Sequence, residues 1–124
     1  MKGIKQFENQ QYLNVETFRK TGQGVKTPVW FAQDGGTLHI WTRADSGKVK
    51  RIRRNSKVRI TPSTASGEPL GEWVDSSAVI IESAEELAKT VGLFKRKYGL
   101  TFQLFGFLGR MRKAQYATIQ VKSE

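Results

Sequence analysis

The chain has 124 residues, a length that fits one domain, and its 38% hydrophobic and 26% charged residues are typical of a folded protein. It has no cysteine and one histidine, which excludes disulfides and thiolate metal sites and argues against a histidine metal cluster. The formal net charge of +10 indicates an anionic partner: nucleic acid, an anionic membrane surface or a phosphorylated small molecule. No apolar run approaches the ~20 residues that span a bilayer, and the first six residues lack a signal peptide's apolar stretch, so we expect a cytoplasmic protein.

Strands and turns alternate over the first third of the chain. Residues 11–18 and 25–33 are rich in β-branched and aromatic side chains and predict two strands, with a turn at residues 21–24. Asp34-Gly35-Gly36 separates the second strand from a third at residues 37–42. This pattern predicts a hairpin with a two-glycine loop.

The predicted hairpin places apolar side chains on both of its faces. In this register Trp30 lies opposite Trp41, and Phe31 lies opposite Ile40. One face carries Trp30, Ala32, His39 and Trp41, and the other carries Val29, Phe31 and Ile40. We therefore expect one face to line the core and the other to be covered by a helix, a second subunit or a planar ligand.

Two helices and three further strands are expected after the hairpin. The first helix spans residues 47–54, with Ser46 or Asp45 as its N-cap and Asn55 at its end. The second begins with a capping box at residues 83–86, ends at Gly99, and carries Leu87, Val91, Phe94 and Tyr98 on one face.

The remaining segments complete the predicted architecture. Strands are expected at residues 57–61, 73–82 and 116–121, a turn at residues 67–71, and a further apolar helix at residues 100–111. Together these elements favour a mostly β fold, an antiparallel barrel with short flanking helices, in one domain covering residues 1–124.

The first helix begins in a run of cations. Five of the seven residues 48–54 are Lys or Arg, and Lys48 lies in the first turn, where the helix dipole disfavours a cation. An anion at this end of the helix would relieve the conflict. The N–H groups of Gly47 and Lys48, the Ser46 hydroxyl and the Lys48 ammonium could converge on one phosphate. The alternative is a solvated basic face, since the Walker-loop pattern is missing.

The sequence offers few candidates for acid–base chemistry. His39 could act as an acid or base by type, but no catalytic motif surrounds it, and the alternative is a packed strand histidine. The eleven acidic residues are scattered, without paired carboxylates. We therefore assign no catalytic residue and no metal ligand, and expect a bound cofactor to supply any chemistry. Residues 102–113 could form an amphipathic membrane anchor or a segment packed on the barrel or between subunits.

Longer motifs resemble the pyridoxamine-phosphate-oxidase-like split β-barrel family, in its branch of coenzyme F420-dependent and FMN-binding proteins. They cover nearly the whole chain: residues 17–20 (TFRK), 27–31 (TPVWF), 41–55 (WTRADSGKVKRIRRN), 67–71 (GEPLG) and 97–100 (KYGL). The resemblance implies a six-stranded antiparallel Greek-key barrel. It also implies a homodimer with cofactor sites at the subunit interface.

The same resemblance assigns roles to particular residues. It places Thr27, Pro28, Val29 and Trp30 beside the ring of FMN or coenzyme F420. It places the ribityl chain and phosphate at Trp41, Thr42, Ser46, Gly47 and Lys48, with Arg54 as a further contact. The second subunit closes the site, with the strand around residues 59–62 as a candidate. The preference of this chain for Lys over Arg favours FMN and leaves both cofactors open.

We therefore expect a flavin- or deazaflavin-dependent oxidoreductase that passes a hydride to a small conjugated substrate, without a metal, a nucleic-acid partner or a membrane. The first alternative is a non-catalytic carrier or sensor of flavin, heme or tetrapyrrole on the same barrel, because no acid–base pair stands out. The second is a nucleic-acid-binding domain, which the net charge suggests but no recognised motif supports.

Overall fold

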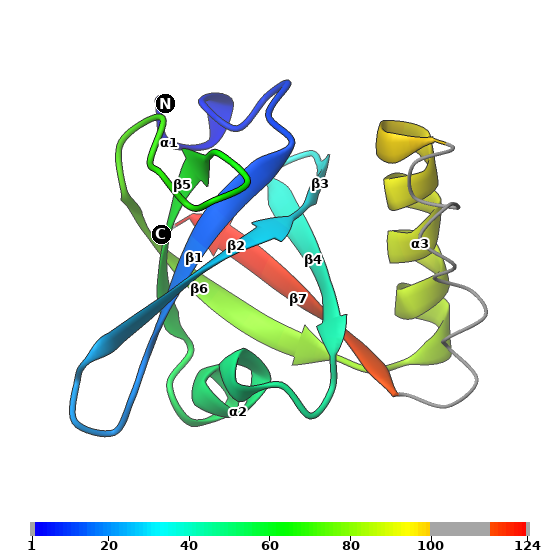
Figure 1. Ribbon diagram of the computed structural model, residues 1–124. Coiled ribbons are helices and arrows are strands. Elements are labelled where there is room, and N and C mark those ends of the chain that lie inside the picture. The colour runs from blue at the N-terminus through cyan, green and yellow to red at the C-terminus, as the bar shows by residue number, and fades with distance from the viewer. Residues whose placement is uncertain (1, 100–114, 124) are drawn as a thin grey trace.

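The computed structural model describes residues 2–99 and 115–123, which form a curled antiparallel sheet with helices around it (Figure 1). The elements in chain order are α1 (Lys2–Lys5), β1 (Tyr12–Phe18), β2 (Gly24–Trp30), β3 (Ala32–Asp34), β4 (Thr37–Arg43), α2 (Gly47–Arg54), β5 (Lys57–Ser63), β6 (Val74–Ile81), α3 (Ala84–Tyr98) and β7 (Tyr116–Ser123). The mostly β prediction is confirmed. The helix expected at residues 100–111 and the segment 102–113 both lie outside the described residues.

The strand predicted at residues 25–33 is divided at Phe31. β2 pairs with β1, and Trp30 lies opposite Tyr12, so the predicted pairing of Trp30 with Trp41 is wrong. β3 pairs with β4, so that Ala32 lies opposite His39. The sheet order is β2-β1-β5-β6-β7-β4-β3, and its two end strands are consecutive in the chain, which curls the sheet towards a barrel.

Because of this division, the described residues form seven strands rather than the six that were predicted, and the Greek-key description is not reproduced in detail. A run of β-branched and aromatic residues predicts extended chain, but it does not show where a strand exchanges one partner for another. The curled, antiparallel, mostly β sheet is nevertheless consistent with a split barrel.

Side chains of α3 bind the backbone of Phe31 where the strand changes partners. The Phe31 N–H donates to the Tyr98 hydroxyl over 3.1 Å, and Lys97 Nζ donates to the Phe31 carbonyl over 2.8 Å. The Tyr98 oxygen also lies 2.8 Å from the Phe31 carbonyl and 2.7 Å from that of Gln11, to one of which it donates its single proton. Burial raises the pKa of the Tyr98 phenol well above its ordinary value, so the proton is retained. These bonds give partners to polar groups that a buried strand break would otherwise leave without them.

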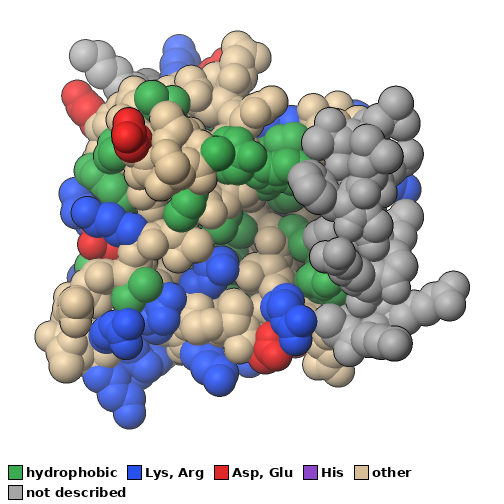
Figure 2. Space-filling view, viewed as in Figure 1, with side chains coloured by type: hydrophobic (Ala, Val, Ile, Leu, Met, Phe, Trp, Pro, Cys, Tyr) green, Lys and Arg blue, Asp and Glu red, His purple; other side chains and the backbone are tan. Residues whose placement is uncertain are grey.

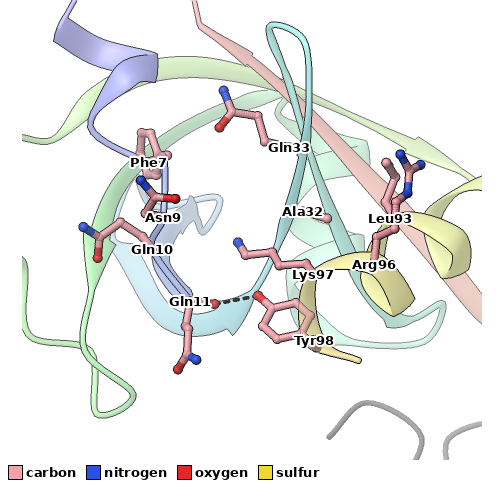
Figure 3. A pocket seen from close by; sticks show the side chains of 10 residues that line it. All are labelled: Phe7, Asn9, Gln10, Gln11, Ala32, Gln33, Leu93, Arg96, Lys97 and Tyr98. Atoms are coloured by element: carbon pink, nitrogen blue, oxygen red, sulfur yellow. Dashed lines mark hydrogen bonds between the residues drawn. The ribbon is translucent and has the colours of Figure 1, made fainter. Parts of the chain in front are cut away.

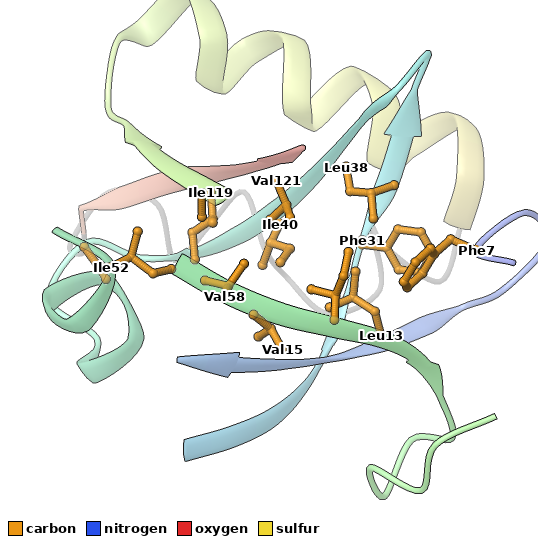
Figure 4. Packing of buried hydrophobic residues seen from close by; sticks show 13 residues of the cluster. Phe7, Leu13, Val15, Phe31, Leu38, Ile40, Ile52, Val58, Ile119 and Val121 are labelled. Carbon is orange, nitrogen blue, oxygen red and sulfur yellow. The ribbon is translucent and has the colours of Figure 1, made fainter. Parts of the chain in front are cut away.

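The two faces of the β3–β4 hairpin are buried as the sequence predicts. The Asp34–Thr37 pair closes a two-glycine loop, in which Gly35 adopts a φ of 61° that favours glycine. Phe31 and Ile40 enter the barrel core, which Figure 4 shows together with Leu13, Val15, Leu38, Val58, Ile119 and Val121. The opposite face, with Trp30, Ala32 and Trp41, packs against Leu93 and Phe94 of α3. A helix, a second subunit or a planar ligand was expected to cover this face, and among the described residues the cover is the helix α3.

The predicted ends of both long helices are confirmed. Ser46 caps α2 by accepting a hydrogen bond from Val49 N over 3.4 Å, and Ser83 caps α3 by accepting one from Glu86 N over 3.3 Å. Gly99 ends α3, again with a positive φ. None of the helices in the described ranges is both long and apolar enough to cross a membrane.

Tyr98→Phe is expected to lower the free energy of unfolding by about 1–3 kcal/mol, because it removes the partner of the buried Phe31 N–H. Urea denaturation followed by tryptophan fluorescence measures the change. Tyr12→Phe is the matched control: the Tyr12 ring packs on Trp30, but its hydroxyl forms no hydrogen bond with the described part of the chain. Equal losses for the two variants would contradict a stabilising role for the Tyr98 hydroxyl.

Candidate functional site

The turn from β4 into α2 brings several predicted site residues together. Trp41 and Thr42 lie near the end of β4, and Ser46 is the N-cap that precedes Gly47 and Lys48. The Ser46 N–H donates to the Arg43 carbonyl over 3.1 Å, and the Thr42 hydroxyl lies 3.4 Å from that of Ser46. Both bonds are local, so the sequence from Trp41 to Lys48 determines this part of the site.

A cation that the sequence analysis did not assign to the site lies across the first turn of α2. Arg51 Nε donates to Thr17 Oγ1 of β1 over 2.7 Å. A Cβ atom added to Gly47 would lie 2.8 Å from Arg51 Nη1, so the guanidinium occupies the space beside the glycine. The spacing of four residues between Gly47 and Arg51 is the signal that could have identified it.

Lys48, Arg51, Arg19 and Arg54 form a group that we call the basic cluster. Burial, and then the neighbouring Arg51, lower the pKa of Lys48 below its ordinary value. Burial, followed by Arg19 and Arg54, lowers that of Arg51. The predicted contact Arg54 donates to the Phe18 carbonyl at the end of β1 over 3.1 Å. The four cations therefore gather where α2 meets the end of β1.

Among the described residues, no carboxylate forms an ion pair with the basic cluster, in contrast to several other arginines. Arg43 pairs with Asp45, Arg53 with Glu82, and Arg59 with Glu16 and Asp75. Within the described ranges, no ion pair involves a member of the basic cluster. Figure 2 shows Lys and Arg side chains gathered on the lower part of one face, over α2 and the β1–β2 end of the sheet. Positive charge concentrated in this way is suited to an anion.

The other predicted residues, Thr27, Pro28, Val29 and Trp30, lie on β2 and are half-buried. β1 lies between β2 and α2, since it pairs with β2 and binds Arg51 through Thr17. β2 is an end strand of the sheet, so no described strand pairs along its outer edge. The structure therefore places these residues on a separate element from the basic cluster.

Both predicted tryptophans make ring contacts inside the chain. Trp30 stacks on Tyr98 with ring centroids 4.4 Å apart and an interplanar angle of 10°. Trp41 stacks on Tyr116 with centroids 5.2 Å apart and an angle of 24°. Each of these contacts involves a face of the indole, which fits packing more directly than ligand stacking on that face.

His39 lies on β4 beneath α3 and is only 3% exposed. Its Nδ1 atom has no hydrogen-bond partner among the described residues, and burial, with Lys89 nearby, lowers its pKa below the ordinary value of 6.5. The side chain is thus a buried neutral imidazole, as the packed interpretation expects. The described chain also contains no group of three or more His, Asp or Glu side chains that could hold a metal ion.

A pocket of about 480 Å³ opens away from the basic cluster, between the segment after α1, β3 and the end of α3 (Figure 3). Its lining includes Phe7, Gln10, Ala32, Leu93, Lys97 and Tyr98. None of these residues was predicted from the sequence to belong to a site, because they come from three separate parts of the chain.

No protein-family model and no curated protein matches this sequence. Solved structures do match its fold. HutZ, the heme storage protein from Vibrio cholerae, aligns with a TM-score of 0.72 and 12% identity over 97% of this chain and 86% of HutZ. An F420 reductase aligns with a TM-score of 0.64 and 18% identity over 97% of this chain and 91% of its own. A Listeria innocua protein, provisionally assigned as a pyridoxamine 5'-phosphate oxidase, aligns with a TM-score of 0.66 and 12% identity over 95% and 87%.

These similarities establish a shared fold. Proteins that share this mostly β fold include one named as a heme storage protein, one named as an F420 reductase and one named as a pyridoxamine 5'-phosphate oxidase. Because a fold hosts several functions, the choice between them depends on the residues of this chain.

His39→Gln is expected to make the protein less sensitive to acid. As the pH falls through the ordinary His pKa of 6.5, the unfolded chain takes up a proton that buried His39 does not, so the free energy of unfolding decreases. Urea denaturation of both proteins at about pH 7.5 and about pH 5.5 measures the difference. Equal decreases in the two proteins would contradict a neutral, buried His39.

Proposed function

We propose that this protein is a member of the pyridoxamine-phosphate-oxidase-like family that binds the phosphate of a flavin-type cofactor, FMN or coenzyme F420, at the basic cluster. The observation that carries the proposal is the concentration of four cations, without a paired carboxylate in the described chain, at the first turn of α2 and the end of β1. Sequence motifs and fold similarity both point towards the same class of protein.

The donors at the start of α2 fit a phosphate. The N–H groups of Gly47 and Lys48 are in the first turn, where helical N–H groups lack intrahelical partners. Lys48 and Arg51 add charged donors, and the Arg51 guanidinium already lies against Gly47. No acidic residue occupies this first turn, so no carboxylate competes with a phosphate there. A charged phosphate would offset the mutual repulsion of these cations.

The residues of this chain would bind and orient the cofactor rather than carry out bond chemistry. The bound flavin or deazaflavin would supply hydride transfer to or from a small conjugated substrate. Ser46, Gly47, Lys48 and Arg51 would hold its phosphate, with Thr42 supporting Ser46. Thr27, Pro28, Val29 and Trp30 would line the ring, with backbone groups at the outer edge of β2 available for its polar atoms.

We further propose that the protein acts as a homodimer and that the second copy completes the cofactor site. Arg19 and Arg54 of the basic cluster are exposed, and no described strand pairs along the outer edge of β2. A second copy at this face would exclude water from the ring, which hydride transfer requires.

A heme carrier is the second candidate, because HutZ shares the fold. Histidine and cysteine are common axial ligands of heme iron. This chain has no cysteine, and its single histidine is buried beneath α3. Binding of heme through His39 would require α3 to move, so the flavin-type cofactor is the better-supported proposal. Absorbance titration of the purified protein with hemin, FMN and F420 separates these candidates.

Lys48→Ala and Arg51→Ala are each expected to weaken FMN or F420 binding about ten- to hundredfold, because each removes a charge-assisted bond to the phosphate. Quenching of tryptophan fluorescence on titration measures the affinity. Lys50→Ala is the matched control, since it removes the same charge from an exposed position on α2.

Circular dichroism should show that all three variants remain folded. Equal affinities for the Lys48→Ala, Lys50→Ala and wild-type proteins would contradict the proposed phosphate site. If the cofactor binds but the protein does not accelerate transfer of a hydride from the reduced cofactor to any conjugated acceptor tested, the carrier function replaces the oxidoreductase.

A further inference from the structure

The pocket at the end of α3 lies apart from the proposed cofactor site. It is formed by the segment that follows α1, by β3 and by the last turns of α3. Figure 1 places these elements at the upper end of the barrel, whereas α2 lies at its lower end. A volume of about 480 Å³ is within the range that accommodates small molecules. The pocket is therefore a second candidate binding site, separate from the basic cluster.

The Lys97 ammonium reaches into this pocket. Nζ donates one hydrogen bond to the Phe31 carbonyl over 2.8 Å and lies 3.5 Å from the centroid of the Phe31 ring. An ammonium has three N–H donors, so two remain available to a ligand. Figure 3 shows the amine between Gln33 and Gln11, facing Phe7 and Gln10 across the pocket. Lys97 forms no ion pair within the described ranges.

The rest of the described lining is complementary to a small anion with an apolar body. Side-chain amides are contributed by Asn9, Gln10, Gln11 and Gln33, and Arg96 adds a second cation. None of the described lining residues is acidic. Phe7 and Leu93 supply apolar surface beside these polar groups. We propose that this pocket binds a small molecule through a carboxylate group, which pairs with Lys97 while its apolar part packs on Phe7 and Leu93.

A carboxylate fits better than a phosphate group. The single negative charge of a carboxylate matches the one ammonium directed into the pocket, and its two oxygens match the two remaining N–H donors. Among the described residues, the helix end that adjoins the pocket is the C-terminal end of α3, and no helix N-terminus lines it. The dipole at this end of α3 disfavours any anion, and it disfavours a dianionic phosphate more strongly than a singly charged carboxylate.

Burial gives this binding a pH signature. Much of the Lys97 side chain is exposed, but its amine lies against the Phe31 ring and carbonyl, and this desolvation lowers its pKa to about 8. Above that pH the Lys97 amine is mostly neutral in the unliganded protein, and it must take up a proton when a carboxylate binds. Affinity should therefore fall about tenfold for each pH unit well above the pKa of Lys97.

Benzoate is the probe, and benzamide is its neutral counterpart. Titration of ¹⁵N-labelled protein is expected to give saturable shifts at the amides of Phe31, Ala32 and Gln33 with benzoate and not with benzamide. Lys97→Met should weaken benzoate binding at least tenfold, whereas Lys97→Arg should retain it and remove the loss of affinity above about pH 8. Lys95→Met, which removes the same charge from an exposed position on α3, should bind as the wild type does.

Three results would overturn the proposal. They are benzoate shifts that map to α2 instead of β3, equal binding of benzoate and benzamide, and unchanged affinity in Lys97→Met. The Lys97→Arg variant keeps the test decisive if Lys97→Met is unstable, because it preserves the charge and changes the pH profile alone. FMN or F420 affinity, measured in parallel on Lys97→Arg, reports on the α2 site separately.

Discussion

The hydrogen bonds between α3 and Phe31 are the contacts on which the rest of the structure depends. Phe31 is fully buried at the one residue between β2 and β3, and a strand that changes partners inside a barrel must satisfy its backbone there. Tyr98 and Lys97 do this from outside the sheet. Because they come from the last turn of α3, the same bonds hold that helix over Trp30 and Trp41 and form one wall of the pocket.

The cations of this protein differ in whether a carboxylate pairs with them. Arg43, Arg53 and Arg59 pair with carboxylates, so their charges are balanced inside the fold. Lys48 and Arg51 are placed among other cations, where burial and repulsion disfavour their charged forms. This arrangement costs free energy in the unbound protein, and that cost is the physical basis of the proposal that an anion binds there. The basic cluster thus holds four of the 21 Lys and Arg residues of the chain, without a paired carboxylate among the described residues.

The sequence predicted what depends on local periodicity and turn chemistry. The two-glycine loop, both serine caps and the two apolar hairpin faces follow from residues near one another in the chain, and the structure confirms them. Arg51 was not predicted as a site residue: its spacing from Gly47 is a local signal, but its bond to Thr17 joins positions 34 residues apart. The pocket was not predicted either, because its walls come from three distant segments. The phosphate assignment for Ser46, Gly47 and Lys48 stays a prediction.

By itself, the sequence determined that the chain is mostly β and where its turns and helix ends lie. It also determined that one helix begins with a cation that the helix dipole disfavours. These properties arise from side-chain size, backbone freedom and charge within a few residues. Only the tertiary structure decided that the strand through Phe31 is divided and that α3 covers the tryptophan face. It also decided that Arg51 lies beside Gly47 and that Lys97 enters a pocket. Each of these results from contacts between segments far apart in the chain, which local pattern does not encode.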